Sequence, residues 1–258
     1  MINLYNIKLL RNFSLSLNVL ITLVLITVTF AFAVKAEDKD HHSDYYSTDL
    51  ASFPYYIKLN AGLSSPEKPK GGFEGSFSKA GLYEFEMGYK LTEDFHLGLN
   101  FGYRSGFKNK YSTSSVIDYD QISMKNFEYK TRSYSWMLNT EYDVIRINGL
   151  TPYLGLGVGM SHNTTKGSEI ETIGLNEQSD HYAYPAGKKN NFAYKVSLGN
   201  KFESNDNSYF IDLRYQFVDL GKITTGRVVA TGLGAENTTS KTGKLRAHEV
   251  LFGIGYKL

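Results

Sequence analysis

Cysteine is absent from the 258-residue chain, proline occurs five times and tryptophan once. Without cysteine, a disulfide framework, a thiolate zinc site and a cysteine nucleophile are all excluded. Few prolines beside 24 glycines, 20 tyrosines and 16 phenylalanines favour long β-strands over helices. A charge excess is also missing, since residues 37–258 carry 25 basic and 26 acidic residues once the three basic residues of 1–36 are set aside. A nearly neutral chain gives no reason to expect nucleic-acid binding.

Long apolar runs are missing except near the N-terminus. Two basic residues precede the apolar run of 19–34, and residues 34–36 (VKA) place small side chains at the −3 and −1 positions of a cleavage site. This order is typical of a secretory signal peptide, and we predict cleavage between Ala36 and Glu37. An uncleaved transmembrane anchor is the alternative, but the run is near the lower length limit for a spanning helix.

The chain therefore divides into a signal peptide (1–36), a flexible periplasmic lead-in (37–52) and a third region, 53–258. The lead-in contains His41, His42 and Asp44, which have metal-binding chemistry. A short polar tail with histidines is more often simply solvated, so we predict no metal and no cofactor.

Apolar and polar residues alternate with a period of two in eight segments of about ten residues. These segments are 53–63, 83–91, 95–104, 134–144, 151–160, 192–202, 209–217 and 249–258. One face of each is aliphatic in the middle with aromatic residues toward the ends, and the other is polar, charged or glycine. A tilted strand of this length crosses a bilayer, and this two-faced pattern is that of a transmembrane barrel with aromatic girdles.

A soluble β-sandwich would show the same alternation, with the apolar faces packed between two sheets. We favour the barrel because the polar faces carry ionisable groups and because the connections alternate in length. The short ones are 92–94, about 145–151 and about 203–208, and the long ones are 64–80, 105–126, 163–190 and 218–244. The prediction is an all-β, antiparallel, up-and-down barrel of eight strands, with short periplasmic turns and long extracellular loops. Segments 115–122 and 227–231 could add short strands or prolong hairpins.

Three motifs carry a resemblance to a known family. Residues 151–159 (TPYLGLGVG) resemble the fifth strand of small OmpA-like and opacity-type outer-membrane barrels, and 215–221 (YQFVDLG) resemble a strand ending of the same group. The last strand, with Phe252, Tyr256 and Leu258, is similar to the family's assembly signal, although the family usually ends in Phe. The resemblance implies an outer-membrane location, contact with membrane lipid and with the barrel-assembly machinery, and a role as surface antigen, adhesin or membrane-stabilising protein.

The polar faces together supply a large set of ionisable residues for the barrel interior. They are Lys58, Glu84, Glu86, Lys90, His96, Arg104, Glu141, Asp143, Lys195, Asp212, Arg214, Glu249 and Lys257. An eight-stranded barrel is just wide enough for side chains to fill it, and unpaired charges there would be costly. We therefore predict a structural network of paired charges, with a gated ion path as the alternative.

Catalysis is the second class of function considered. Ser161-His162 and His248 fall near the outer ends of two segments, where small barrels that modify lipids can carry a Ser/His site. A triad also needs an orienting group in the correct geometry, and no spacing here guarantees one. The glycines of 151–159 alternate on a strand instead of leading into a helix, so they form no nucleotide loop. We predict a protein that is not an enzyme.

The long loops are the remaining candidates for function. They are rich in Lys, Asn, Thr, Ser, Tyr and Gly, and such residues suit adaptable recognition surfaces. We predict a surface antigen or adhesin that contacts a host-cell surface protein through loops 64–80, 105–126, 163–190 and 218–244. This hypothesis rests mainly on the family resemblance. The alternative is a narrow-pore porin, followed by a lipid-modifying enzyme.

Overall fold

The computed structural model describes residues 55–118, 121–173, 178–204, 208–227 and 240–258. The predicted signal peptide 1–36, its cleavage between Ala36 and Glu37, and the lead-in 37–52 lie outside these residues. Within the described part of the chain, no helix is long and apolar enough to cross a membrane.

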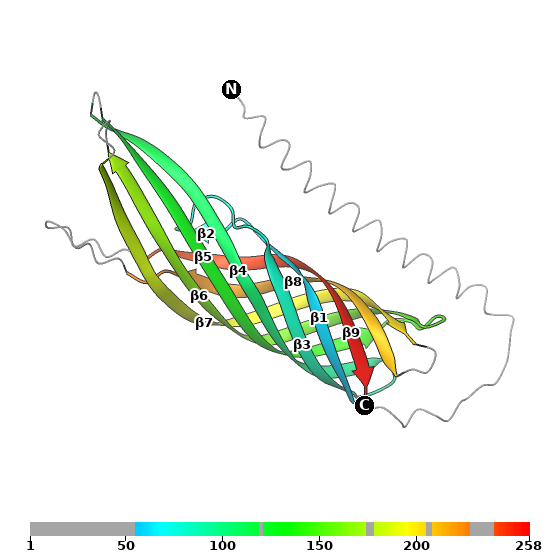
Figure 1. Ribbon diagram of the computed structural model, residues 1–258. Helices are drawn as coiled ribbons and strands as arrows, with labels where there is room; N and C mark the ends of the chain where they lie inside the picture. Colours follow the sequence, from blue (N-terminus) through cyan, green and yellow to red (C-terminus); the bar gives the residue numbers. More distant parts are fainter. Residues whose placement is uncertain (1–54, 119–120, 174–177, 205–207, 228–239) are drawn as a thin grey trace, which may run out of the picture. The chain divides into compact units, whose positions relative to one another are not determined.

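Eight long antiparallel strands form a closed ring (Figure 1). They are β1 Tyr55–Pro66, β3 Ala80–Lys90, β4 Phe95–Asp118, β5 Gln121–Asp143, β6 Leu150–Ile173, β7 Gln178–Glu203, β8 Tyr209–Thr224 and β9 Thr242–Lys257. Each strand pairs with the next one along the chain, and β9 closes the ring by pairing with β1. The two-residue strand β2, Lys70–Gly71, adds to β9 above the ring. The predicted eight-stranded up-and-down barrel is confirmed.

The wall of the barrel has its apolar side outward. Leu59, Trp136 and Ile254 are about six-tenths exposed on the outer face, whereas Lys58 and Asp212 are fully buried on the inner face. Closure pairs every strand edge within the ring, which is the condition for spanning a bilayer with strands. The outer apolar band can therefore face lipid while the polar side chains fill the interior.

The short turns between strands lie where the sequence predicts them. At the first, the Thr92 hydroxyl accepts a hydrogen bond from the Phe95 backbone N–H at 3.1 Å. At the second, Asn148 and Gly149 have φ values of 48° and 80°, in the left-handed region that asparagine and glycine tolerate best. These turns reverse the chain tightly and keep neighbouring strands in register.

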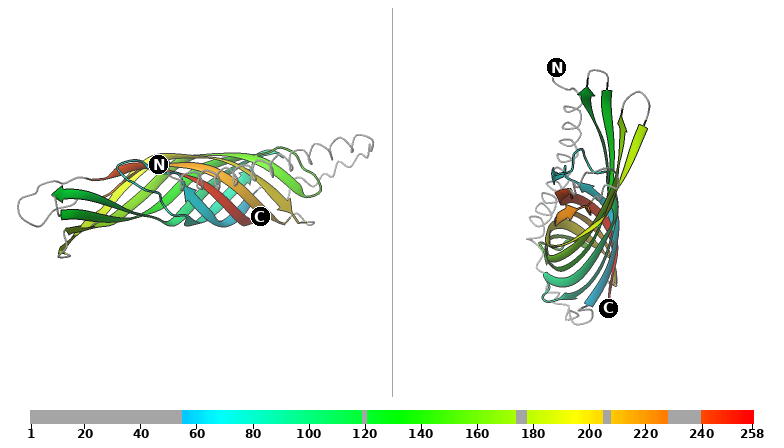
Figure 2. Two further views of the ribbon diagram at one scale, coloured as in Figure 1. Left: turned by 90° about the horizontal axis from the view of Figure 1, so that it is seen from above. Right: turned by 90° about the vertical axis from the view of Figure 1, so that its left-hand side faces the viewer.

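The predicted extents of the long loops are wrong. Most of 105–126 belongs to β4 and β5, and most of 163–190 belongs to β6 and β7. The other two loops, 64–80 and 218–244, also lose residues to strands at both ends. Figure 2 shows the two long hairpins rising beyond the ring.

The physical reason is that these strands leave the lipid. Beyond the bilayer the outward side chains face water and are mostly polar, so the alternation that predicted the strands fades. Irregularities between Arg104 and Phe107, and between Thr165 and Gly167, also shift the phase of the pattern. The segment 115–122 does prolong the β4–β5 hairpin, whereas 228–231 lies outside the described residues.

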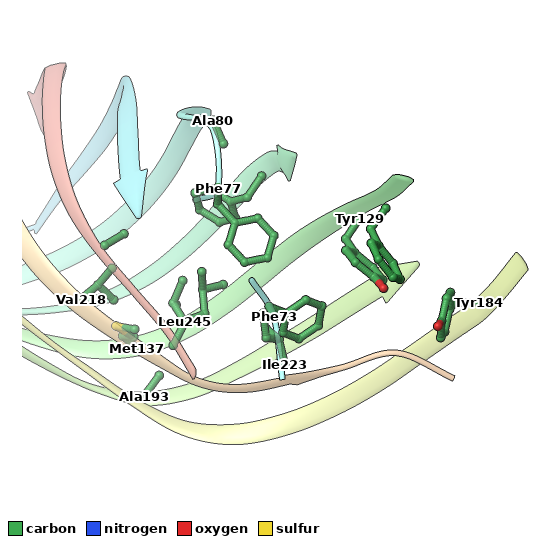
Figure 3. Packing of buried hydrophobic residues seen from close by; sticks show 14 residues of the cluster. Phe73, Phe77, Ala80, Tyr129, Met137, Tyr184, Ala193, Val218, Ile223 and Leu245 are labelled. Carbon is green, nitrogen blue, oxygen red and sulfur yellow. The ribbon is translucent and has the colours of Figure 1, made fainter. Parts of the chain in front are cut away.

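An apolar cluster fills the interior at the outer end of the barrel (Figure 3). Phe73 and Phe77 come from the connection after β1, and their rings lie 5.9 Å apart. The Phe73 ring makes an edge contact with Tyr129 of β5 at 5.1 Å. The other members are Ala80, Phe107, Phe127, Met137, Tyr184, Ala193, Val218, Leu220, Ile223, Leu245 and Ala247. Several of these residues lie in the predicted loops, so parts of those loops form a core.

Gly199 leaves room for the buried ring of Tyr153, so a larger residue at position 199 should destabilise the barrel. A Cβ at Gly199 would lie 2.6 Å from Cζ of Tyr153, whose ring is held by a 2.7 Å hydrogen bond from its hydroxyl to Asp212. We expect Gly199→Ala to lower the free energy of unfolding by about 1–3 kcal/mol through overpacking. Urea unfolding in lipid vesicles, followed by circular dichroism, measures this change.

The matched control is Gly72→Ala, where a Cβ would meet no atom closer than 3.5 Å. If both variants unfold at the same urea concentration, the close packing of Tyr153 against Gly199 is not a constraint on the barrel.

Candidate functional site

The middle of the barrel interior holds a dense set of buried charges. Its cations are Lys58, Arg104, Lys195, Lys201 and Arg214, and its carboxylates are Glu84, Glu86, Glu141, Asp143, Asp212 and Glu249. All stand on inward-facing positions of strands β1, β3, β4, β5, β7, β8 and β9. The near balance of five cations against six carboxylates allows almost every charge to find a partner.

Glu84 and Glu249 each bind an arginine. Arg104 contacts Glu249 with both ends of its guanidinium group, Nε to Oε1 at 2.7 Å and Nη2 to Oε2 at 2.9 Å. Arg214 donates from Nη2 to Glu84 Oε2 at 2.7 Å. The Gln216 amide joins the two pairs, because its Nε2 donates to Glu84 at 2.9 Å and to Glu249 at 2.6 Å. Two-pronged arginine contacts of this kind combine strength with fixed geometry.

Lys58 is the centre of a second group. Its Nζ lies 2.7 Å from Glu141, 3.3 Å from Glu86 and 3.4 Å from Asp212. These carboxylates come from β5, β3 and β8, so a single ammonium group connects strands on several sides of the ring. A cation with three carboxylate neighbours is compensated for the water it has lost.

Asp143 is the centre of the third group, near the turn end of the barrel. Lys201 Nζ lies 2.9 Å from Asp143 and 3.1 Å from Glu141. His96 Nε2 and Arg146 Nη2 each lie 3.0 Å from Asp143 Oδ2. Arg146 is about one-third exposed, so this group reaches the solvent at that end of the barrel.

Two predicted members of the interior set lie apart from these groups. Lys90 is half-exposed at the end of β3 and makes no ion pair with any residue that the structure describes. Lys257, on β9, pairs instead with Glu203 of β7 at 3.1 Å, across the start of β8. Both are correctly placed on the inward face by the alternation, but they lie beyond the buried section.

The sequence prediction missed several residues that complete the network. Lys201 and Gln216 share the inward face with predicted charges, and this spacing was the signal available. Tyr56 and Tyr153 also point inward, where the Tyr56 hydroxyl donates to Glu86 at 2.9 Å and the Tyr153 hydroxyl donates to Asp212 at 2.7 Å. Tyrosine occurs on both faces of this barrel, so residue type alone did not separate these two from the lipid-facing ones.

The Ser/His candidates for catalysis do not come together. Ser161 points inward and donates from its hydroxyl to the Leu220 carbonyl at 2.6 Å. His162, the next residue, is on the outer face, with Nδ1 2.6 Å from the Asn190 side-chain oxygen. Adjacent residues of one strand face opposite sides, so His162 cannot act as the base for Ser161. The third candidate, His248, hydrogen-bonds to the hydroxyl of Tyr215 at 2.6 Å.

The C-terminal strand places the predicted assembly residues on the lipid side. Phe252, Tyr256 and Leu258 are all about half exposed. The Leu258 backbone N–H donates to the Tyr55 carbonyl at 2.8 Å, which fixes the end of β9 beside the start of β1. Recognition of this strand by the barrel-assembly machinery stays a prediction.

The β4–β7 hairpins form an ordered sheet beyond the lipid band. Tyr103 and Tyr134 stack with ring centroids 4.9 Å apart at the outer edge of the band, and β4 continues for fifteen residues after Tyr103. Farther out, the Tyr184 hydroxyl donates to Glu169 at 2.6 Å. Burial and this carboxylate raise the pKa of Tyr184, so the hydroxyl remains a donor at any physiological pH. The hydrogen bond of Tyr184 to Glu169 and its packing in the apolar cluster help to fix the shape of the extension.

The Arg104–Glu249 pair predicts a stability pattern. We expect Glu249→Gln or Arg104→Met to lower the free energy of unfolding by about 3–5 kcal/mol, because each leaves a buried charge without its partner. The double variant should lower the free energy of unfolding by less than the sum of the two single losses. Urea titration of the barrel in lipid vesicles measures all three values.

The matched control is the Lys110–Glu128 pair, which has the same charges at 3.0 Å but side chains 67% and 50% exposed. Lys110→Met and Glu128→Gln should each change the free energy by less than about 1 kcal/mol. Equal effects at the two sites would contradict the importance of the buried pair.

Comparison with known proteins finds several chains that are similar to this one. The chain is 26% identical over 200 residues to outer membrane protein PagN of Salmonella typhimurium, which covers 77% of this chain and 78% of that protein. It is 28% identical over 178 residues to "Putative adhesin RC1281" of Rickettsia conorii, covering 65% and 69%. Among solved structures, Neisserial surface protein A is similar with a TM-score of 0.42 and 14% identity, covering 80% of this chain and 97% of that one.

The family model described as "Outer membrane protein beta-barrel domain" matches residues 23–257. The match includes all eight strands of the ring and the interior network that they carry. The chain belongs to the outer membrane protein β-barrel domain family and is a protein of the outer membrane.

Proposed function

We propose that this chain is a non-enzymatic surface protein that attaches the cell to another surface through the tips of its two long hairpins. The observation that carries the proposal is the continuation of β4–β7 beyond the lipid band as one paired sheet. Fifteen residues of β4 past Tyr103 correspond to roughly 50 Å along the strand. The outer end of β4 is therefore held well away from the bilayer.

The extension is suited to presenting a binding surface because it has a core of its own. Phe127 and Tyr129 of β5, Tyr184 of β7 and Phe73 of the β1–β3 connection pack on its inner side. Lys241, which directly precedes β9, adds to this packing. Its Nζ lies 4.0 Å from the Phe127 ring centroid and 2.7 Å from the Tyr111 hydroxyl. Recognition residues on a rigid scaffold lose less conformational freedom on binding.

The closed interior gives less support to the porin alternative. A porin needs a continuous wet path, whereas the middle of this barrel is occupied by paired charges and its outer end by the apolar cluster. We propose that the charge network has a structural role and holds the ring together. The opposed directions of Ser161 and His162 likewise give no support to a lipid-modifying enzyme.

The relatives favour the same class of function. One of them bears the name of an adhesin, and it matches this chain over most of the barrel. A host-cell surface component is therefore the proposed partner, now assigned to the hairpin tips instead of to all of loops 64–80, 105–126, 163–190 and 218–244.

Trimming the two tips tests the proposal without touching the barrel. Residues 113–125 are replaced by Asn-Gly between the paired residues Ser112 and Asn126, and residues 170–181 by Asn-Gly between the paired residues Glu169 and Tyr182. Both cuts retain the apolar cluster and the charge network. We expect attachment of cells bearing the trimmed protein to a host-cell monolayer to fall to the level of cells without it.

The matched control replaces the same residues with Gly/Ser stretches of unchanged length, which separates the chemistry of the tips from their reach. Surface exposure of each variant is checked by antibody binding to an epitope tag in the connection between β8 and β9, which neither cut alters. Full attachment by correctly exposed, doubly trimmed protein would rule out the hairpin tips as the adhesive surface.

A further inference from the structure

Basic residues stand just beyond the lipid band on the outward face of the β4–β7 sheet. We call five of them the cationic row: Lys108, Lys130, Arg132, Lys166 and Lys188. Lys130 is partly buried and the other four are exposed. Together they present positive charge across four adjacent strands.

The strand register aligns these charges against one another. Lys108 is the direct cross-strand partner of Lys130, and Lys130 is the direct partner of Lys166. On the next level toward the membrane, Arg132 is paired with Thr164, which is in turn paired with Lys188. Like charges directly opposite one another destabilise a sheet, so three aligned lysines are an unfavourable arrangement in isolation.

The carboxylate that shares the outward face of β5 with the row, Glu128, is paired with Lys110 at 3.0 Å and with no member of the row. None of its five members has an ion-pair partner among the residues that the structure describes. Other cations at the outer end do: Lys244 and Arg246 lie 3.4 Å and 2.8 Å from Asp219. Hydrogen bonds from the Gly221 backbone and from Arg246 hold the pKa of Asp219 below its usual value against the opposing effect of burial. The row is thus an uncompensated patch, in contrast to the buried cations of the barrel interior.

The position of the row indicates what lies against it. Arg132 is two residues and Lys130 four residues beyond Tyr134, whose ring marks the outer edge of the lipid band. At about 3.3 Å per residue along a tilted strand, the cations are within roughly 15 Å of that edge. The face is a continuation of the outer barrel wall, so it looks sideways over the membrane surface at the level of lipid headgroups.

We propose that the cationic row binds the phosphate groups of a phosphorylated glycolipid in the outer leaflet surrounding the barrel. A phosphate accepts hydrogen bonds from several donors, so one group can lie between neighbouring lysines and turn their repulsion into shared attraction. Basic residues near an anionic membrane surface attract its headgroups over about a Debye length. The lipid that surrounds the barrel then also stabilises the part of the hairpins nearest the membrane.

The test places the full mature protein in phosphatidylcholine vesicles containing either bis-phosphorylated lipid A or lipid A from which both phosphates have been removed. We expect phosphorylated lipid A to raise the thermal midpoint of the wild-type barrel by on the order of 5 °C relative to the phosphate-free form. The variant K108Q/K130Q/K166Q should lose this increment. In phosphate-free vesicles the same variant should melt no lower than wild type, because the like-charge repulsion has been removed.

The control K108R/K130R/K166R keeps the charge and should keep the increment, and added NaCl should reduce it. Equal wild-type midpoints in the two lipids, or an increment retained by the glutamine variant, would overturn the proposal. An equal rise produced in phosphate-free vesicles by inorganic phosphate, or by a soluble sulfated polysaccharide, would also overturn it, because the row would then bind anions in general. Attachment through the hairpin tips is scored separately, so either proposal can fail alone.

Discussion

The structure depends on compensated charge inside a closed ring of strands. An inward carboxylate such as Glu84 has lost its water, and the guanidinium of Arg214, the ammonium of Lys195 and the amide of Gln216 are among the groups that replace it. Because these partners stand on β7 and β8 while Glu84 stands on β3, the pairing connects opposite sides of the wall. The same contacts that stabilise the barrel also occupy the space that an aqueous path through it would need. The proposed function therefore belongs to the parts of the chain outside the lipid.

The barrel changes its internal chemistry along its axis. Toward the turns the interior is polar and paired, and toward the outside it becomes apolar around Phe73, Phe107 and Tyr129. The outer face changes in the opposite sense, from an aliphatic and aromatic band to the exposed cations of Lys108 and Lys166. Above the membrane the sheet is therefore an ordinary half-buried one, with an apolar inner side and a polar outer side. This reversal allows the hairpins to stay ordered in water.

The fold was largely predictable because lipid imposes a strict alternation on the residues that span it. All eight strands, their direction and the short turns followed from that pattern, as did the inward placement of Glu86, Asp212 and Arg214. The strand extensions were not predictable by the same rule, since water permits polar residues on their outer side and bulges such as that between Arg104 and Phe107 reset the phase. The partners of individual charges were also out of reach, because Arg104 and Glu249 are 145 positions apart and meet only when β9 closes on β1.

Single-channel recording in planar lipid bilayers is the most direct test of a closed, charge-compensated interior. We expect the wild-type barrel to show no steady conductance, and variants that break the network at Glu84, Glu86 or Arg214 to show openings as the interior loosens. Steady wild-type openings whose conductance is unchanged by these same replacements would contradict the account, because ions would then cross by a path that the buried charges do not block.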